Sequence, residues 1–179
     1  MNAFEELVAD LLRQQGYWVD TSVKVKLSAK DKAAIGKPSA PRWEIDVVAY
    51  KGATNELLAV ECKSYLDSAG VRLAALDGSA PRHAKRFKLF NDEKLCGIVL
   101  RRLVDGLVAG DSIARKPTVT LALACGKVAS EANRDKLARL FEEKGWRLFD
   151  DRWIRTQVQA SAKAAHHDSV AMMVAKILK

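Results

Sequence analysis

Two short apolar segments of this sequence carry ionisable residues whose types and spacing suit the binding of a metal ion. Asp46 lies in the segment 43–50, and Glu61 and Lys63 lie in the segment 57–63. Side chains alternate across a β-strand, so Glu61 and Lys63 share one face if the second segment is extended. An unpaired buried charge is expensive, and we therefore expect these carboxylates to have a cation as partner.

The turn between the two segments decides how these charges meet. It contains a glycine and an asparagine, which are common turn formers, and it predicts a hairpin. If the hairpin turn is centred between Ala53 and Thr54, Asp46 lies opposite Glu61 and Glu44 lies opposite Lys63. A register shifted by two residues would still leave Asp46 and Glu61 on one face as diagonal neighbours.

A cluster of this kind suits a hard divalent cation. Mg²⁺ is commonly held by one or two carboxylates together with waters and substrate phosphate. We expect Asp46 and Glu61 to bind the metal, and Lys63 to orient or help deprotonate a water or to neutralise charge on a phosphate oxygen. The alternative is a structural ion pair of Lys63 with Glu61 or Glu44 on a solvated face of the sheet.

Asp46, fourteen intervening residues and then Glu61-Cys62-Lys63 resemble the D…E-x-K signature of the PD-(D/E)xK nuclease superfamily. In that superfamily the acidic residues bind Mg²⁺ and the lysine assists the attack of water on a phosphodiester. Ile45 stands where the nominal signature has proline, a departure that is common in the superfamily. The resemblance implies a restriction-endonuclease-like α/β fold with an αβββαβ core, and hydrolysis that leaves a 5′-phosphate.

The N-terminal residues 4–17 predict a capped amphipathic helix, with Asn2 as N-cap and Gly16 just past its end. At about 100° per residue, Glu5 borders the buried face while Glu6 points away. This opening resembles that of archaeal Holliday junction resolvases and Mrr-like restriction endonucleases, whose first-helix glutamate precedes the glycine by eleven positions. The same count selects Glu5 here as a catalytic-site residue. The alternative for both glutamates is a charge placed favourably at a helix N-terminus.

The balance of charge favours a polyanionic partner, which we expect to be DNA. The chain has 30 Lys and Arg against 22 Asp and Glu, a net charge of +8. Residues 1–70 carry 9 basic and 10 acidic side chains, whereas residues 71–179 carry 21 basic and 12 acidic ones. A nuclease needs such a division, because its metal ligands are acidic while the surface that follows DNA is not.

Two groups of basic residues are candidates for binding DNA. A helix beginning at Pro81 would place three of them on one face as phosphate contacts: Arg82, Lys85 and Arg86. An ordinary solvated helix face is the alternative. Lys24 and Lys26 lie on the polar side of a predicted strand that should neighbour the metal site. Arg101 and Arg102 are interpreted as plain surface residues.

The remaining elements predict one α/β domain, with a mixed central sheet flanked by helices. We expect strands at 17–27, 43–50, 57–63, 118–125 and 146–149, and a polar loop at 28–42. We expect helices at 131–144 and at about 84–109, the second either continuous or broken near Gly97. This order is the one that the superfamily resemblance implies, and the resemblance covers about residues 4–149. No linker rich in Gly, Ser or Pro divides the chain, so we place one nuclease-like domain at residues 1–158.

The last residues, 159–179, predict a C-terminal amphipathic helix with apolar side chains at helical spacing. Its apolar face needs a partner, which is either the body of the domain or the same helix of a second subunit. The second arrangement would make the protein a homodimer, and a homodimer is our expectation.

Other chemistries are poorly supported by the sequence. The three cysteines are isolated, and together with the absence of a signal peptide they predict a reducing, cytoplasmic environment. The adjacent His166 and His167 are poorly spaced to share a zinc ion, and no glycine-rich phosphate loop is present. No run of about 18 apolar residues predicts a membrane span.

The sequence thus predicts a Mg²⁺-dependent endodeoxyribonuclease in which Asp46 and Glu61 bind metal, Lys63 assists the water and Glu5 completes the site. Mn²⁺ is expected to substitute for Mg²⁺. The alternative, from a different functional class, is a DNA-binding or assembly module that keeps the nuclease fold without cleaving.

Overall fold

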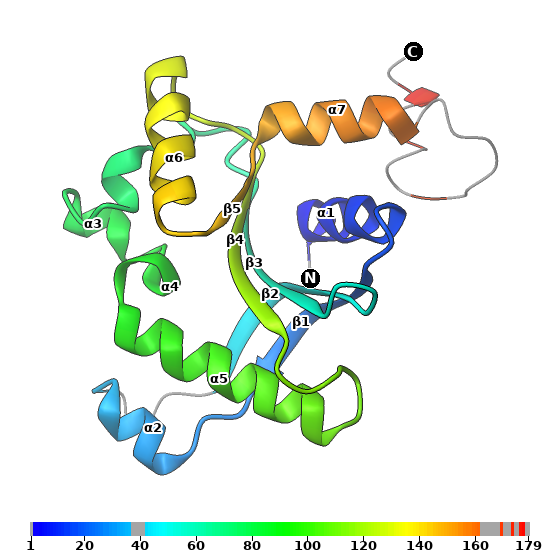
Figure 1. Cartoon of the computed structure of the whole chain (residues 1–179). Coiled ribbons are helices and arrows are strands. Elements are labelled where there is room, and N and C mark those ends of the chain that lie inside the picture. The colour runs from blue at the N-terminus through cyan, green and yellow to red at the C-terminus, as the bar shows by residue number, and fades with distance from the viewer. Residues whose placement is uncertain (1, 37–41, 162–168, 170–172, 174–175, 178–179) are drawn as a thin grey trace.

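A five-stranded sheet lies at the centre of the computed structural model, which describes residues 2–36, 42–161, 169, 173 and 176–177 (Figure 1). Its strands are β1 (Trp18–Val25), β2 (Trp43–Lys51), β3 (Glu56–Lys63), β4 (Thr118–Cys125) and β5 (Arg147–Phe149). They lie side by side in chain order. Strand β2 is antiparallel to both β1 and β3, whereas β3, β4 and β5 run parallel to one another. The sheet is therefore mixed, as the sequence predicts.

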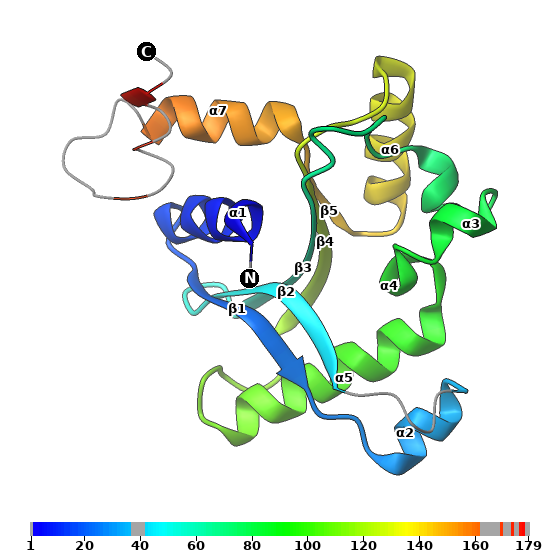
Figure 2. The same ribbon diagram turned by 180° about the vertical axis from the view of Figure 1, so that it is seen from behind.

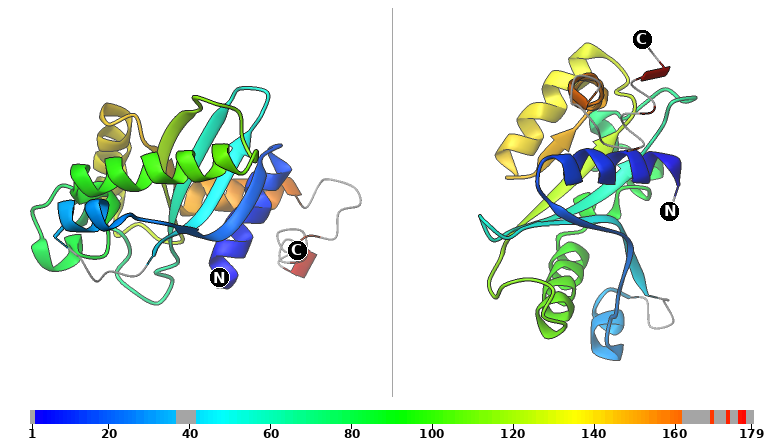
Figure 3. Two further views of the ribbon diagram at one scale, coloured as in Figure 1. Left: turned by 90° about the horizontal axis from the view of Figure 1, so that it is seen from below. Right: turned by 90° about the vertical axis from the view of Figure 1, so that its right-hand side faces the viewer.

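Helices cover both faces of this sheet, which confirms the predicted α/β class with flanking helices and a C-terminal helix (Figures 1 and 3). One face carries α1 (Ala3–Gln14) and α7 (Asp151–Ser161). The other carries α4 (Lys88–Asn91), α5 (Glu93–Ala109) and α6 (Glu131–Glu143). Three short elements lie at the periphery: α2 (Ala29–Ala34), the 3₁₀ turn η1 (Leu73–Ala75) and α3 (Pro81–Ala84). In the part of the chain that the structure describes, no helix combines the length and apolar character of a membrane span.

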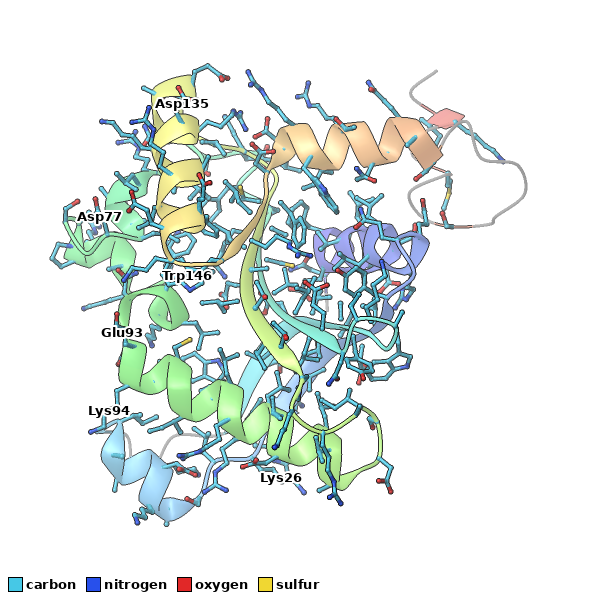
Figure 4. All side chains as sticks on the ribbon, viewed as in Figure 1. Lys26, Asp77, Glu93, Lys94, Asp135 and Trp146 are labelled. Atoms are coloured by element: carbon cyan, nitrogen blue, oxygen red, sulfur yellow. The ribbon has the colours of Figure 1, made fainter. Side chains whose placement is uncertain are left out.

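Each face of the sheet has its own hydrophobic core. The larger core lies under α5 and α6 and includes Leu95, Val99 and Leu137. Trp146 and two phenylalanines form an aromatic cluster that fixes α4 and α6 to this core, and Figure 4 labels Trp146 between the two helices. The smaller core joins α1 to the sheet through Val8 and other residues. The sheet is thus held rigidly from both sides.

The predicted N-terminal helix forms for local reasons. The side chain of Asn2 accepts hydrogen bonds from the backbone N–H groups of Phe4 and Glu5, and Glu5 accepts from the backbone N–H of Asn2 in return. This reciprocal capping satisfies donors that a helix start leaves unpaired. Gly16 follows the helix with a φ of +83°, a conformation that glycine adopts without steric cost.

The structure corrects the expected long helix at residues 84–109. Helix α3 ends at Ala84, two helices, α4 and α5, occupy the rest of the segment, and the chain between α3 and α4 turns so that Phe87 is buried at 2% exposure. Asp92 then caps α5 by accepting a hydrogen bond from the backbone N–H of Leu95 at 2.9 Å. Gly97, where a break was expected, lies inside α5. Burial of an aromatic residue and a new cap therefore decide the breaks.

Two further segments differ from expectation. The loop predicted at 28–42 contains α2, because Ser28 and Asp31 form a capping box at its start. Helix α7 begins at Asp151 and runs through residue 159, where a separate C-terminal helix was expected to begin. Most of the predicted helix at 159–179, with His166 and His167, lies outside the described residues.

Candidate active site

The hairpin of β2 and β3 has the predicted register. Val47 pairs with Val60 and Lys51 pairs with Glu56, and continuing the same register places Asp46 opposite Glu61. The paired ladder ends at Val47, the residue that follows Asp46 in the sequence. There the Asp46 Oδ2 atom accepts a hydrogen bond from the backbone N–H of Cys62 at 2.7 Å. The carboxylate thus takes the place of a backbone acceptor where the two strands part.

The strict alternation expected along β2 fails at Asp46. Ile45 packs in the core under α5, whereas Val47 packs in the core under α1, although strand parity predicts that they share a face. On the neighbouring strand, Ser22 adopts a φ of +54° and drops out of the β1–β2 pairing at the same level. The regular alternation of the sheet is therefore interrupted at Asp46, between a residue of one core and a residue of the other.

Glu61 and Lys63 form an ion pair with each other at the carboxyl end of β3. Their side chains are only 17% and 20% exposed, so the pair is largely shielded from bulk water. The two residues are separated by one position on the strand, as the shared-face prediction requires. One oxygen of Glu61 is therefore bound by an ammonium group.

The electrostatics tie these residues into one unit with Asp46. Burial, and next the negative charge of Glu61, raise the pKa of Asp46 from its ordinary 3.8 to about 6, against the opposing effects of the Cys62 N–H and Lys63. Burial lowers the pKa of Lys63, but the charges of Glu61 and Asp46 outweigh it, so the net shift is upward. The site therefore holds a carboxyl group, that of Asp46, which resists ionisation, and an ammonium group, that of Lys63, which resists deprotonation.

Glu5 contributes to this unit from the first helix. Its charge raises the pKa of Asp46 further, and the N-terminal end of α1 faces the sheet near β2 (Figure 2). Both carboxylate oxygens of Glu5 accept hydrogen bonds from Asn2, at 2.9 Å and 2.6 Å. Glu5 is 9% exposed, whereas Glu6 pairs with Arg13 at the surface. The predicted helix phase is confirmed, and Glu5 combines a capping role with a place near Asp46.

Glu44 departs from the predicted cluster. It is exposed, and its partner across the ladder is Lys24 of β1. The β2–β3 ladder that would have placed Glu44 opposite Lys63 ends before it reaches that level. The carboxylates gathered around Lys63 are therefore Glu61 and Asp46.

The residues present fit a magnesium ion better than a metal held entirely by side chains. Among the described residues, no three His, Cys, Asp or Glu side chains are grouped so that they could hold a metal ion. Mg²⁺ needs only one or two carboxylates, because waters and substrate phosphate complete its shell. Asp46 and Glu61 meet this lower requirement. The buried thiol of Cys62, whose pKa is raised well above its ordinary value by burial, is not a ligand of the thiolate type.

The candidate DNA-binding residues lie on two separate surfaces. Lys24 on β1 and Lys26, just past the end of that strand, are exposed and, with Arg102, line a groove of about 490 Å³ between β1 and α5. Lys26 projects at the lower edge of the molecule beneath α5 in Figure 4. Three further basic residues are exposed on α3 and the turn that follows it: Arg82, Lys85 and Arg86.

Arg101 and Arg102 are more than the plain surface residues that the sequence predicted. Arg102 pairs with the buried Asp31 at 2.7 Å, and Arg101 approaches the same carboxylate at 3.3 Å. The two arginines therefore fasten α2 to α5. Sequence spacing gave no signal for this contact, because 70 residues separate Asp31 from Arg101.

Tyr65 was not identified from the sequence, although it follows Lys63 by two positions. Its φ of +47° is rare for a bulky residue, and its phenol acts on the pKa of Lys63. An aromatic side chain two residues after an E-x-K motif was the available signal, but it is not specific enough to use alone.

No protein-family model, curated protein or solved structure matches this chain. The resemblance to the PD-(D/E)xK superfamily therefore rests on the residues of the chain itself. The geometry that bears on it is the meeting of Asp46, Glu61 and Lys63 at the point where β2 and β3 part.

Proposed function

We propose that the protein is a Mg²⁺-dependent DNA endonuclease that hydrolyses phosphodiester bonds. The observation that carries the proposal is the meeting of two carboxylates and one ammonium group, from Asp46, Glu61 and Lys63, at the end of the β2–β3 ladder. Charged groups this well shielded are costly to maintain. They were not needed to close the hairpin, because its register is already set by the apolar pairs before them.

Asp46 and Glu61 would hold the metal. Bound there, Mg²⁺ would activate a water and neutralise charge on the phosphate that is attacked. Its charge would also favour the ionised form of Asp46, whose pKa is raised by burial and by the neighbouring Glu61. Binding of Mg²⁺ would therefore displace a proton from Asp46 at pH values below the pKa of this residue.

Lys63 acts as an ammonium group in this proposal. Its raised pKa opposes loss of the proton near neutral pH, so it suits donation of a hydrogen bond to a phosphate oxygen or to the attacking water. A cation bound by Glu61 would compete with Lys63 for that carboxylate. Lys63 would then be released toward the substrate, still within the same shielded site.

The positive surfaces support DNA as the substrate. Lys24 pairs with Glu44, two residues before Asp46 on β2, and Lys26 follows just past the end of β1. Contacts from such residues to phosphates position a duplex without reading its sequence. The second surface, on α3 and the turn after it, lies beyond the carboxyl end of β3 in the chain.

A DNA-binding or assembly module that does not cleave is the second candidate. The observation in its favour is the ion pair of Lys63 with Glu61, which satisfies both charges without any metal. Under this alternative the cluster is structural, and the basic surfaces alone carry the function.

Cleavage of labelled DNA distinguishes the two candidates. Junction, duplex, flap and single-stranded DNAs are incubated with Mg²⁺, with Mn²⁺ or with EDTA. We expect cleavage in either metal and none in EDTA, and we expect Asp46→Asn, Glu61→Gln and Lys63→Ala each to lower the rate by orders of magnitude. Metal-free DNA binding should be kept or improved by the two carboxylate changes, because they lessen repulsion of phosphate.

Glu44→Gln is the matched control for these variants. Glu44 lies two residues from Asp46 on the same strand but is exposed, so its replacement should leave the rate within about twofold of wild type. Full metal-dependent activity in any of the three site variants would refute the active-site assignment. Tight DNA binding with no cleavage on the whole panel would favour the non-cleaving module.

A further inference from the structure

A cavity of about 530 Å³ opens beside the candidate active site. It is formed by the chain that leaves β3, by η1 and by the segment that contains α3. Its volume lies within the range of about 300–1,000 Å³ that is usual for small-ligand pockets. No role in metal binding accounts for it, because Asp46 and Glu61 are not among its lining residues.

The cavity is continuous in the chain with the catalytic strand. Tyr65, which lines it, follows Lys63 by two residues. The cavity also lies past the carboxyl ends of the parallel strands β3 and β4, where their outgoing chains meet through a bridge between Val71 and Val128. Ligands of open α/β sheets commonly bind at this edge.

The lining combines an aromatic ring with positive charge. Three lining residues are basic or can become so, namely Arg72, His83 and Arg86, and all three are exposed. Among the described residues that line the cavity, none is acidic. The ring of Tyr65 is steadied by an edge contact with the buried Phe87, with ring centres 6.3 Å apart. An anion attached to a flat ring suits this combination.

The loop that carries the ring is preformed. Tyr65 holds a φ of +47°, which costs free energy in a bulky residue and persists only where the surroundings enforce it. Gly70 closes the same loop at a φ of +83°, and a Cβ there would come within 2.9 Å of the backbone at residues 128 and 129. The glycine thus allows the loop to pack against the chain that leaves β4, and the same loop carries Tyr65 in the wall of the cavity.

We propose that this cavity receives one unpaired nucleotide of the DNA strand held at the active site, with its base against Tyr65 and its phosphate near Arg86 or Arg72. The inference rests on the proposed nuclease function and names its substrate class: DNA that carries a mismatched, bulged or single-stranded nucleotide. Taking a nucleotide out of a duplex costs least where it is already unpaired. Such DNA is therefore favoured over a fully paired duplex.

Binding measured without catalysis tests this inference. Hairpin duplexes that are identical except for one bulged nucleotide are titrated with the wild-type protein in EDTA. Base–aromatic stacking predicts a preference of at least about fivefold for the bulged DNA. With 2-aminopurine as the bulged base, stacking on Tyr65 should change its fluorescence, whereas the same base inside the paired duplex should give no change.

Substitutions locate the preference. Tyr65→Ala should abolish it while affinity for paired DNA stays within about twofold, and Tyr65→Phe should retain it. Arg86→Ala should weaken bulged DNA more than paired DNA. Arg82→Ala is its matched control, because Arg82 is equally exposed on the same short segment but does not line the cavity, and it should weaken both DNAs alike.

The outcomes separate this inference from the proposed function. Metal-dependent cleavage with equal affinity for bulged and paired DNA would overturn the cavity assignment alone. A preference that depends on Tyr65 in a protein that never cleaves would support the cavity and overturn the nuclease. A preference that survives both Tyr65→Ala and Arg86→Ala would also overturn the inference, and the second variant guards against misfolding of the first because Arg86 is exposed.

Discussion

Replacing Asp46 with asparagine is expected to stabilise the metal-free protein near neutral pH while removing cleavage. The pKa of Asp46 rises from 3.8 to about 6 on folding, chiefly through burial and the charge of Glu61. A carboxyl group whose pKa is higher in the folded state binds more protons there, so stability falls as pH rises through the interval between about 4 and 6. Asparagine is neutral throughout, and its amide oxygen can still accept the hydrogen bond from the Cys62 N–H.

The size of the effect follows from the two pKa values. A difference of about two corresponds to about 3 kcal/mol of lost stability at neutral pH in the absence of screening. Asp46 is only partly buried, so solvent screening reduces this figure, and we expect a gain of about 1 kcal/mol for Asp46→Asn. For a chain of 179 residues such a gain corresponds to a rise in Tm of a few degrees.

Denaturant unfolding from pH 4 to pH 7.5 in EDTA measures this prediction. The stability difference between variant and wild type should be small at pH 4 and reach its plateau above pH 6. Glu44→Gln serves as the control, since Glu44 is exposed on the same strand and should show no such pH profile. Destabilisation by Asp46→Asn at pH 7, or a difference independent of pH, would refute the assignment of a strained carboxylate at this position.

Three other predictions follow from the same electrostatics. The affinity for Mg²⁺, measured by calorimetry, should rise between pH 5 and pH 7 and level off above pH 7, because a proton competes with the metal for Asp46 below its pKa of about 6. An affinity that is constant over this range would contradict Asp46 as a metal ligand. Glu5→Gln should lower cleavage through weaker metal binding, with partial rescue by higher Mg²⁺ or by Mn²⁺, whereas Glu6→Gln should cost at most about 1 kcal/mol of stability and no activity. Loss of activity in Glu6→Gln but not in Glu5→Gln would show that the assigned role of Glu5 is wrong. Charge reversal at Arg82, Lys85 and Arg86 should weaken binding to all DNA sequences alike. The slope of log affinity against log salt concentration should become shallower by about 0.9 for each phosphate contact that is lost. An unchanged slope would show that DNA binds elsewhere on the protein.

The hairpin and the first helix could be predicted because their determinants are local. The β2–β3 register follows from a short turn, in which Asn55 takes the positive φ that such turns favour, and from the apolar pairs on either side. The start of α1 follows from Asn2 and Glu5, three residues apart, which satisfy each other's backbone. Three of the four groups around the site are positioned by the hairpin, and the fourth by this cap.

The features that sequence reasoning missed depend on contacts between distant segments. The interruption at Asp46 is matched by a positive φ at Ser22, and nothing in the type of that residue predicts such a conformation. The break before α4 is set by burial of Phe87, and α2 is held by arginines from α5. Strand parity and helical periodicity assume an uninterrupted element, so they fail where tertiary packing interrupts one.

The interruption at Asp46 bears directly on what the site can do. In an unbroken ladder, a carboxylate at this position would share its face with a full row of neighbours, and Cys62 would donate its N–H to a backbone carbonyl. Here the side chain of Asp46 accepts that bond with one oxygen, which anchors the carboxylate and leaves its second oxygen for another partner. Glu61 is arranged similarly, with one oxygen bound to Lys63. Each carboxylate therefore has one oxygen fixed by a neighbour within the protein, and the proposed role in metal binding would fall to the other oxygen.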